Sequence, residues 1–451
     1  MAAEVRAMAG NRPVPAHGPG APAGTSHLQG LLGDCVHCGF CLPACPTYQL
    51  WGEEADSPRG RIHIVGQILA GAPPEGAALQ HLDRCLSCLA CVSACPSGVR
   101  YGEIIEEARA WTEPTSRRGL GDRLTREAIF ALFPYPRRLR AARLLLVAAE
   151  AAGLRRALHK PSVEARLPAP LAPLAAMERL APAAAPVERL ARRVPAQGEP
   201  RGVVGLVAGC VQSVFFSRVN AATARVLSAE GFDVVVAEGQ GCCGALSLHA
   251  GRRSEAARLA KRTVTAFERA GVELVVANAA GCGSAMKDYG RLFAGDPLYE
   301  APASWLADHT RDLSELLAGT EPRAERHPLP LVAAFHDACH LAHAQGIRSK
   351  PRQLLHQIPG LELREVGDDT CCGSAGVYNL LQPGPARALG ARKAAALAAT
   401  RADVVVSTNP GCLMQIQVSA EDAGRPVRTL HLAEILDLSI RGQALPPTPK
   451  G

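Results

Sequence analysis

The sequence predicts a multidomain α+β fold, in which a mostly helical N-terminal domain precedes two copies of an α/β module. Two observations support this fold class. Of the sixteen cysteines, eight form two dense runs near the N-terminus, and the other eight recur at a fixed interval in the C-terminal half. From Val203 onward, strand-like and helix-like segments alternate, which is typical of parallel sheets.

The N-terminal cysteines form two identical motifs. Each run has the spacing C-x2-C-x2-C-x3-C-P and ends in Pro46 or Pro96. This is the bacterial ferredoxin pattern for [4Fe–4S] clusters, in which the fourth cysteine of each run ligates the other cluster. We therefore expect cluster one on Cys35, Cys38, Cys41 and Cys95, and cluster two on Cys85, Cys88, Cys91 and Cys45. Zinc ribbons use two C-x2-C pairs, which argues against zinc here.

The spacing between the runs indicates helices. The 39 residues between Cys45 and Cys85 are more than a minimal ferredoxin needs, so we expect a helical di-cluster ferredoxin domain. Apolar residues at helical spacing predict helices over 59–69 and 101–111. His37 lies inside the first motif, and we expect it to stay outside the ligand set.

The C-terminal half is an internal repeat. Cys210, Cys242, Cys243 and Cys282 recur as Cys339, Cys371, Cys372 and Cys412, with offsets of 129, 129, 129 and 130 residues. Each copy has Cys-Cys-Gly at its centre, so we call the copies Cys-Cys-Gly modules. Strands are expected at 203–208, 233–237, 274–277, 331–335, 363–366 and 404–407, and helices at 218–230, 254–270 and 384–400.

The module cysteines follow predicted strand ends, where sites form in open α/β sheets. Four thiols of each module can therefore converge as an additional iron–sulfur or zinc site, and reduced cysteines without metal remain an alternative. His336, His340 and His343 surround Cys339, and imidazole suits zinc as well as Rieske-type clusters. No matching trio surrounds Cys210, so we expect these histidines not to be ligands.

These features predict five segments. They are a disordered tail (1–27), the ferredoxin-type domain (28–112), a helical basic segment with a Pro/Ala-rich linker (113–201), the first Cys-Cys-Gly module (202–325) and the second (326–440). Residues 161–201 contain eight prolines, which is typical of linkers.

Composition excludes several classes of protein. The formal charge of +7 comes without a nucleic-acid-binding module, so we expect no nucleic-acid partner. We see neither a signal peptide nor an apolar stretch of about 18 residues, so we expect no export and no transmembrane segment. A cytoplasmic protein keeps its thiols reduced, which favours metal ligation over disulfides.

In the stretch from Arg117 to Lys160, basic residues alternate with apolar ones. One interpretation is a peripheral contact with the inner face of the cytoplasmic membrane. The alternative, which we favour, is a helix packed on the ferredoxin domain with its arginines in solvent.

Beyond these patterns, residues 28–440 resemble the glycolate oxidase iron–sulfur subunit family. The resemblance rests on stretches such as Pro46-Thr47-Tyr48-Gln49-Leu50 and Pro58-Arg59-Gly60-Arg61-Ile62, and on residues 35–41, 81–86, 95–101, 221–227, 281–283 and 371–376. The modules also resemble those of heterodisulfide reductase subunits, some of which end in C-x2-C and hold a noncubane cluster. Here Ala285 and Gln415 stand where that last cysteine would be.

The resemblance implies an iron–sulfur electron-transfer subunit of a glycolate oxidase, itself without catalytic residues. It implies flavin-binding partner subunits that oxidise glycolate to glyoxylate, and the membrane quinone pool as acceptor. Three alternatives stay open. They are an iron–sulfur subunit of a lactate dehydrogenase, one of a glycerol-3-phosphate dehydrogenase, and a heterodisulfide reductase-like thiol–disulfide enzyme.

Overall fold

The computed structural model describes residues 25–153, 179–181 and 187–446. They form two units. The first unit contains the described residues up to Cys85 and Cys91–Arg117. The second contains Leu86–Ala90 and the described residues from Arg118 onward. Most of the predicted tail and a large part of the predicted linker lie outside the described residues. Helix α1 begins at Thr25, within the range predicted as tail.

The first unit is helical, as expected. Its elements are α1 (Thr25–Gly33), α2 (Pro46–Trp51), η1 (Glu54–Asp56), α3 (Pro58–Leu69), α4 (Ala77–Asp83), α5 (Ala90–Ser93, whose first residue belongs to the second unit) and α6 (Tyr101–Thr115). Ser57 caps the N-terminus of helix α3, because its side chain accepts a hydrogen bond from the Gly60 amide. Pro58 fixes the backbone φ angle that the first turn of the helix needs. Apolar residues of α1, α3, α4 and α6 form its core.

The second unit contains two sheets. The strands are β1 (Arg193–Val194), β2 (Gly202–Leu206), β3 (Phe232–Val235), β4 (Leu274–Ala277), β5 (Thr310–Asp312), β6 (Leu331–Phe335), β7 (Leu361–Arg364), β8 (Val404–Ser407) and β9 (Arg428–His431). The sheet orders are β1-β3-β2-β4-β5 and β7-β6-β8-β9. Among the described strands, β1 alone pairs antiparallel, with β3. The six predicted strands are present, each within two residues of its expected bounds.

Helices connect these strands in both modules. The first module has α12 (Gln212–Phe215), α13 (Ser217–Ala229), α14 (Ala245–His249), α15 (Arg253–Ala270), α16 (Ala280–Lys287), α17 (Tyr289–Leu292), α18 (Glu300–His309) and α19 (Leu313–Ala318). The second has the π-helical turn η3 (His340–Ala344), then α20 (Ser349–His356), α21 (Tyr378–Leu381), α22 (Pro383–Ala399), α23 (Pro410–Asp422) and α24 (Leu432–Ile440).

Apart from the edge strand β1, the two sheets have the same topology, which confirms the repeat. Strands β2, β3, β4 and β5 correspond in order and pairing to β6, β7, β8 and β9. In both, the first and third strands of the module are neighbours, which creates a topological switch point at their carboxyl ends. The topology therefore places the loops after β2 and β4, and after β6 and β8, at one edge of each sheet.

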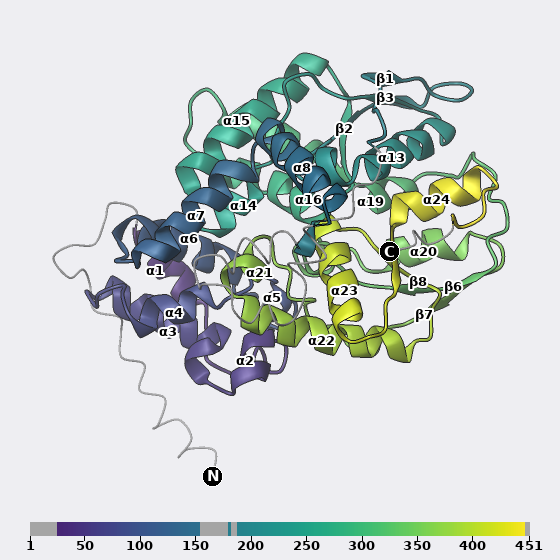
Figure 1. The fold of residues 1–451 in the computed structure, drawn as a ribbon. Helices are drawn as coiled ribbons and strands as arrows, with labels where there is room; N and C mark the ends of the chain where they lie inside the picture. Colours follow the sequence, from purple (N-terminus) through teal and green to yellow (C-terminus); the bar gives the residue numbers. More distant parts are fainter. Residues whose placement is uncertain (1–24, 154–178, 182–186, 447–451) are drawn as a thin grey trace, which may run out of the picture. The chain divides into compact units, whose positions relative to one another are not determined.

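One hydrophobic cluster joins the two modules. Helices α13 and α24 run side by side (Figure 1), and buried residues of both modules, such as Leu227 and Leu436, belong to the same apolar cluster. Arg225 in α13 also donates to both carboxylate oxygens of Asp437 in α24, at 2.9 and 2.7 Å. At the carboxyl ends of β9 and β4, His431 Nε2 lies 2.7 Å from the Asn278 carbonyl oxygen. These contacts fix the two module sites relative to each other.

The basic segment contains helices α7 (Leu120–Leu132) and α8 (Pro136–Ala151). The favoured expectation, packing on the ferredoxin domain, is wrong for α7. Ile129 and Phe130 are buried against Leu246 of the first module and Val377 of the second. The sequence could not show this because the apolar partners lie more than a hundred residues away.

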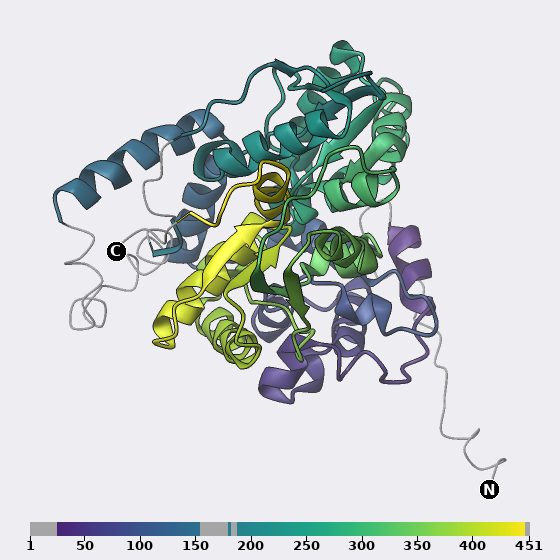
Figure 2. The ribbon, with the colours of Figure 1, turned by 90° about the vertical axis from the view of Figure 1, so that its right-hand side faces the viewer.

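Helix α8 makes few apolar contacts. In Figure 2 it extends outward from the rest of the second unit. Leu139 is its one buried residue, whereas Leu144 and Leu145 are 70% and 73% exposed. Within the described ranges, no helix combines the length and the apolar character that crossing a membrane requires.

Candidate iron–sulfur and metal sites

The two ferredoxin-type loops have the same backbone. His37 and Ser87, each two residues after the first cysteine of its run, have φ angles of 55° and 54°. Gly39 and Leu89, each following the second cysteine, have φ angles of 87° and 62°. Left-handed backbone at non-glycine residues is uncommon and concentrates at functional sites. Both loops therefore wind the same way around the position of a metal centre.

Cys35, Cys38, Cys41 and Cys95 line one small pocket, of about 30 Å³. Cys91 of the second run lies on its wall as well. Burial raises the pKa of Cys35, and the neighbouring Cys95 and Cys38 thiols raise it further. A bound metal supplies the positive charge that turns such crowded thiols into thiolate ligands. Converging thiols fit an iron–sulfur cluster, and the five on this pocket include the four expected for cluster one.

The pocket opens between exposed apolar side chains. Val36 and Phe40 are 67% and 64% exposed, and both line it. Cys38 is the exposed cysteine of the set.

The Pro58-Arg59-Gly60-Arg61 stretch supports the first cysteine run. Arg59 Nη1 donates to the carbonyl oxygen of His37, at 3.0 Å, inside the first loop. His37 thus contributes its backbone to this contact. Residue 60 must be glycine because there is no room for a side chain: a Cβ on Gly60 would lie 1.9 Å from the Glu54 carbonyl oxygen.

Arg61 is a buried cation beside the ligands expected for cluster two. It is 1% exposed, and its Nη2 donates to Asp56 Oδ1 at 3.2 Å and to Thr47 Oγ1 at 3.1 Å. Its Nη1 lies 4.0 Å from Cys45 Sγ. Burial opposes the charge, but Cys85 and other acidic groups outweigh it and raise the pKa of Arg61. The guanidinium therefore stays charged and offsets negative charge at the thiolates.

Hydroxyl groups also contact these thiols. Thr47 Oγ1 lies 3.2 Å from Cys45 Sγ, and the Tyr101 hydroxyl donates to Cys85 Sγ at 3.6 Å. Hydrogen bonds to cluster sulfurs are one of the means by which proteins set cluster potentials. The motifs containing Arg61, Thr47 and Tyr101 were noted in the sequence, but none of these roles was predicted.

In the first module, the four thiols meet at the carboxyl edge of the sheet. Cys210 follows β2, Cys242 and Cys243 follow β3, and Cys282 lies in α16 after β4. Cys210 Sγ lies 3.4 Å from Cys242 Sγ. Hydrogen bonds with Cys242 and Cys282 lower the pKa of Cys243, while contact with Cys243 raises the pKa of Cys282. The predicted convergence is thus present in the structure.

The second module repeats this arrangement. Cys339 precedes η3, Cys371 and Cys372 follow β7, and Cys412 lies in α23. Contact with Cys371, together with burial, raises the pKa of Cys339. Asn409 Nδ2 donates to Cys412 Sγ at 3.4 Å. Each module therefore offers four adjoining thiols, which suits a bound metal centre.

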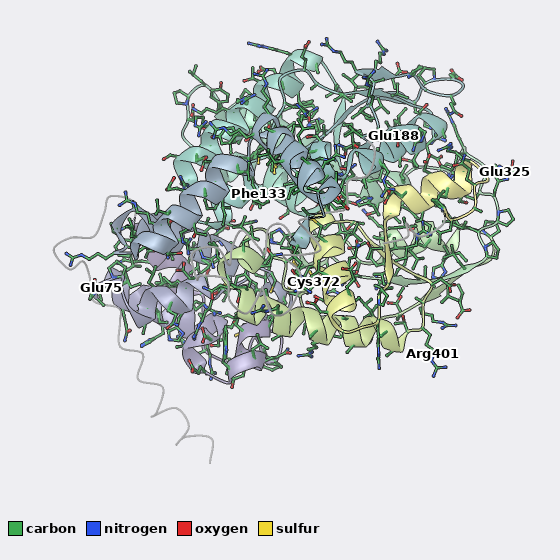
Figure 3. All side chains as sticks on the ribbon, viewed as in Figure 1. Glu75, Phe133, Glu188, Glu325, Cys372 and Arg401 are labelled. Carbon is green, nitrogen blue, oxygen red and sulfur yellow. The ribbon has the colours of Figure 1, made fainter. Side chains whose placement is uncertain are left out.

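One cavity of about 170 Å³ reaches both module sites. Its walls include all eight module cysteines. Phe133, at the C-terminal end of α7, and Cys372 both line this cavity. Both residues are labelled in Figure 3. The repeat thus places its two cysteine sets on a common internal space.

The backbone conformation and the close packing around it both require glycine at the third position of each Cys-Cys-Gly motif. Gly244 and Gly373 have φ angles of 86° and 88°. A Cβ would lie 2.8 Å from the Ala256 carbonyl oxygen in the first module, and 2.7 Å from that of Ala386 in the second. Only glycine adopts this turn without strain while the cysteines approach the helix.

We expect Gly373→Ala to lower the free energy of unfolding by roughly 2–4 kcal/mol, since it adds left-handed strain and overpacking. Gly384→Ala in α22 is the matched control, because a Cβ there meets nothing within 4 Å. Denaturant unfolding followed by circular dichroism under anaerobic conditions measures both. Equal stability of the two variants would contradict this explanation of the motif.

The histidines near Cys339 have different environments. His340 makes an edge contact with the ring of His249, with centroids 4.9 Å apart. His343 Nδ1 lies 3.2 Å from Arg348 Nη2. Burial lowers the pKa of His336 to about 3, so its imidazole is neutral. One ligand atom from each of His336, Cys372 and Cys412 lies within 4.8 Å of the other two.

The two positions that lack a fifth cysteine are filled by structural residues. Ala285 is buried in the apolar core of the first module. Gln415 Oε1 accepts from Asn379 Nδ2 at 3.0 Å. Neither position offers a thiol, so each module keeps four.

Comparison with known proteins identifies the family. The chain is 36% identical to the probable glycolate oxidase iron–sulfur subunit of Bacillus subtilis over 416 residues, which cover 90% of this chain and 94% of the relative. It is 35% identical to the glycolate oxidase iron–sulfur subunit of Escherichia coli over 421 residues, covering 91% and 94%. The chain belongs to the glycolate oxidase iron–sulfur subunit family. As a member, it is an iron–sulfur electron-transfer subunit of an oxidoreductase.

Family models match the parts of this iron–sulfur subunit separately. A 4Fe-4S dicluster domain matches residues 32–99, and a cysteine-rich domain matches 204–287 and 333–417. The linker region of glycolate oxidase iron–sulfur subunits matches 121–181. Lactate utilization protein A of Bacillus velezensis is 32% identical, over 52% of this chain and 98% of its own length. These matches indicate iron–sulfur clusters and confirm the Cys-Cys-Gly repeat.

Proposed function

We propose that this chain carries electrons within a glycolate oxidase, from flavin-binding subunits that oxidise glycolate to glyoxylate toward a membrane quinone. The observation that supports this best is the pair of ferredoxin-type runs in a chain that aligns along 90% of its length with a glycolate oxidase iron–sulfur subunit. The substrate is bound by the partner subunits, and no catalytic residue is proposed in this chain.

The proposed cofactors are two [4Fe–4S] clusters. Cluster one takes Cys35, Cys38, Cys41 and Cys95, and cluster two takes Cys85, Cys88, Cys91 and Cys45. When bound, such clusters accept and release single electrons. The chain's own residues hold the loops, exclude water and place the Arg61 cation beside Cys45. The thiols of the Cys-Cys-Gly modules are proposed as further metal sites, and the four of the first module suit an iron–sulfur cluster or zinc.

Lactate oxidation is the second candidate, because lactate utilization proteins are among the relatives. The match to the glycolate oxidase linker region over 121–181 favours glycolate. A thiol–disulfide reaction of the heterodisulfide reductase type is less well supported, since Ala285 and Gln415 leave each module without a fifth thiol.

We propose a cytoplasmic location with peripheral attachment to the membrane through partner subunits or α8. The exposed Leu144 and Leu145 lie among arginines on this helix, a combination that suits an anionic lipid surface.

The experiment is performed on the anaerobically purified complex. Added glycolate is expected to reduce the clusters, seen by electron paramagnetic resonance, and a quinone analogue to reoxidise them. Reduction by lactate but not by glycolate would replace the proposal with its second candidate. Clusters that no 2-hydroxy acid reduces would refute both.

Phe40 offers a test of electron exchange. An exposed aromatic residue beside the cluster-one pocket is suited to contact a redox partner subunit. We expect Phe40→Glu to slow electron exchange in the complex about tenfold, as loss of a central interface residue does. Iron content should stay unchanged. Leu298→Glu, at a residue 77% exposed, is the control, and an equal slowing in both variants would argue against this surface.

A further inference from the structure

His336 is a buried histidine with an unsatisfied ring nitrogen. It follows β6 and is 3% exposed. Its amide donates to the Val406 carbonyl oxygen at 2.8 Å, and its own carbonyl accepts from Ser407 Oγ at 3.0 Å. The backbone is thus fixed between β6 and β8. Its Nε2, however, has no hydrogen-bond partner among the described residues. A buried polar atom without a partner is costly, so it calls for an explanation.

The ring lies against two thiols from other elements. Ligand atoms of His336, Cys372 and Cys412 all lie within 4.8 Å of one another, and all three residues are buried. In a tetrahedral zinc site, with Zn–S of about 2.3 Å, ligand atoms stand roughly 3.5–4 Å apart. The three atoms therefore have nearly the spacing that a single ion requires.

The first module lacks this feature. Val207 occupies the corresponding position after β2, and it is buried in the apolar core of that module. Two sites that are alike in their cysteines thus differ in one ligand-forming residue. At this position, therefore, only the second of the two described modules has an imidazole beside its thiols.

We propose that the second module binds one mononuclear zinc-type ion through His336, Cys372 and Cys412. These three residues supply one nitrogen and two sulfur ligands, which leaves one position of a tetrahedral ion to a water molecule. The ion ties together the end of β6, the Cys371–Cys372 loop and α23. This inference goes beyond the proposed electron transfer, and it implies that electrons do not pass through the second module, since zinc has no redox chemistry.

The test is metal analysis of the full chain, purified anaerobically, for wild type and three variants. His336→Val copies the first module and is expected to lose about one zinc per chain with iron unchanged. His336→Cys restores a ligand and should retain that zinc. His343→Gln, in the π-helical turn η3, is the matched control and should also retain it. Zinc-edge absorption of the wild type should show mixed sulfur and nitrogen ligation.

Several outcomes would overturn the proposal. These are wild-type protein without zinc, unchanged zinc in His336→Val, or a loss of iron instead of zinc. If His336→Val fails to fold, the result for His336→Cys is used instead. A folded His336→Cys protein that lacks this zinc refutes the site, and one that retains the zinc supports it. Because the readout is zinc, failure of the site is distinguishable from failure of glycolate-dependent electron transfer.

Discussion

Cys95→Ala is expected to remove cluster one and to leave cluster two. Cys95 belongs to the second run by sequence, yet it lines the same pocket as Cys35, Cys38 and Cys41. Iron should fall from about eight to about four per chain, because each [4Fe–4S] cluster holds four. Glycolate-dependent quinone reduction by the complex should be lost, since a conduit fails when one of its centres is missing.

Two reference variants make this test specific. Cys35→Ala removes a ligand that belongs to cluster one under any assignment, and Cys85→Ala one that belongs to cluster two. The remaining cluster in Cys95→Ala should have the spectrum and potential found in Cys35→Ala. If it matches Cys85→Ala instead, each run ligates its own cluster and the crossed assignment is wrong.

Arg61→Leu should destabilise the first unit by about 3 kcal/mol. Removing one partner of a buried ion pair costs about 3–5 kcal/mol because the other charge stays buried. Asp56 is 0% exposed, but in the variant it still has Arg84 as an ion-pair partner, because Arg84 Nη1 lies 2.8 Å from Asp56 Oδ2. We therefore expect a loss of stability at the lower end of this range. Losing a cation near Cys45 should also shift the potential of cluster two to more negative values.

Anaerobic denaturation and a redox titration measure the two effects. Arg100→Gln is the control, because the Arg100 side chain is exposed where it pairs with Glu103, and pairs at the surface contribute about 0–1 kcal/mol. Arg61→Lys keeps the positive charge but not the shape of the guanidinium. We expect its cluster-two potential to stay close to that of the wild type, while its free energy of unfolding is lower. A stable Arg61→Leu protein with an unchanged potential would show that this cation does not act on the cluster.

The sequence predicted those features that depend on local pattern. The spacing of Cys35 to Cys45 identified a cluster loop, and the offset from Cys210 to Cys339 identified the repeat. The strands were predictable because they are short, apolar and bounded by turns. Their short parallel neighbours β5 and β9 were not, since segments such as Thr310–Asp312 lack an apolar pattern.

What escaped prediction depends on contacts between distant residues. Arg61 is buried only because Asp56, Thr47 and the cluster thiols surround it, whereas arginine is ordinarily exposed. The packing of Phe130 on Val377 joins residues far apart in sequence. His336 was set aside with its neighbours because the first module has no such trio. Its unsatisfied Nε2 becomes visible only in three dimensions.

The most direct test of the account is the count of iron, acid-labile sulfide and zinc in the anaerobically purified chain. We expect at least about eight iron and eight sulfide, from two [4Fe–4S] clusters, together with about one zinc from the second module. More iron than that would place a further cluster in the first module. Little iron and sulfide, with zinc in stoichiometric amounts, would contradict the assignment of this chain as an iron–sulfur electron carrier.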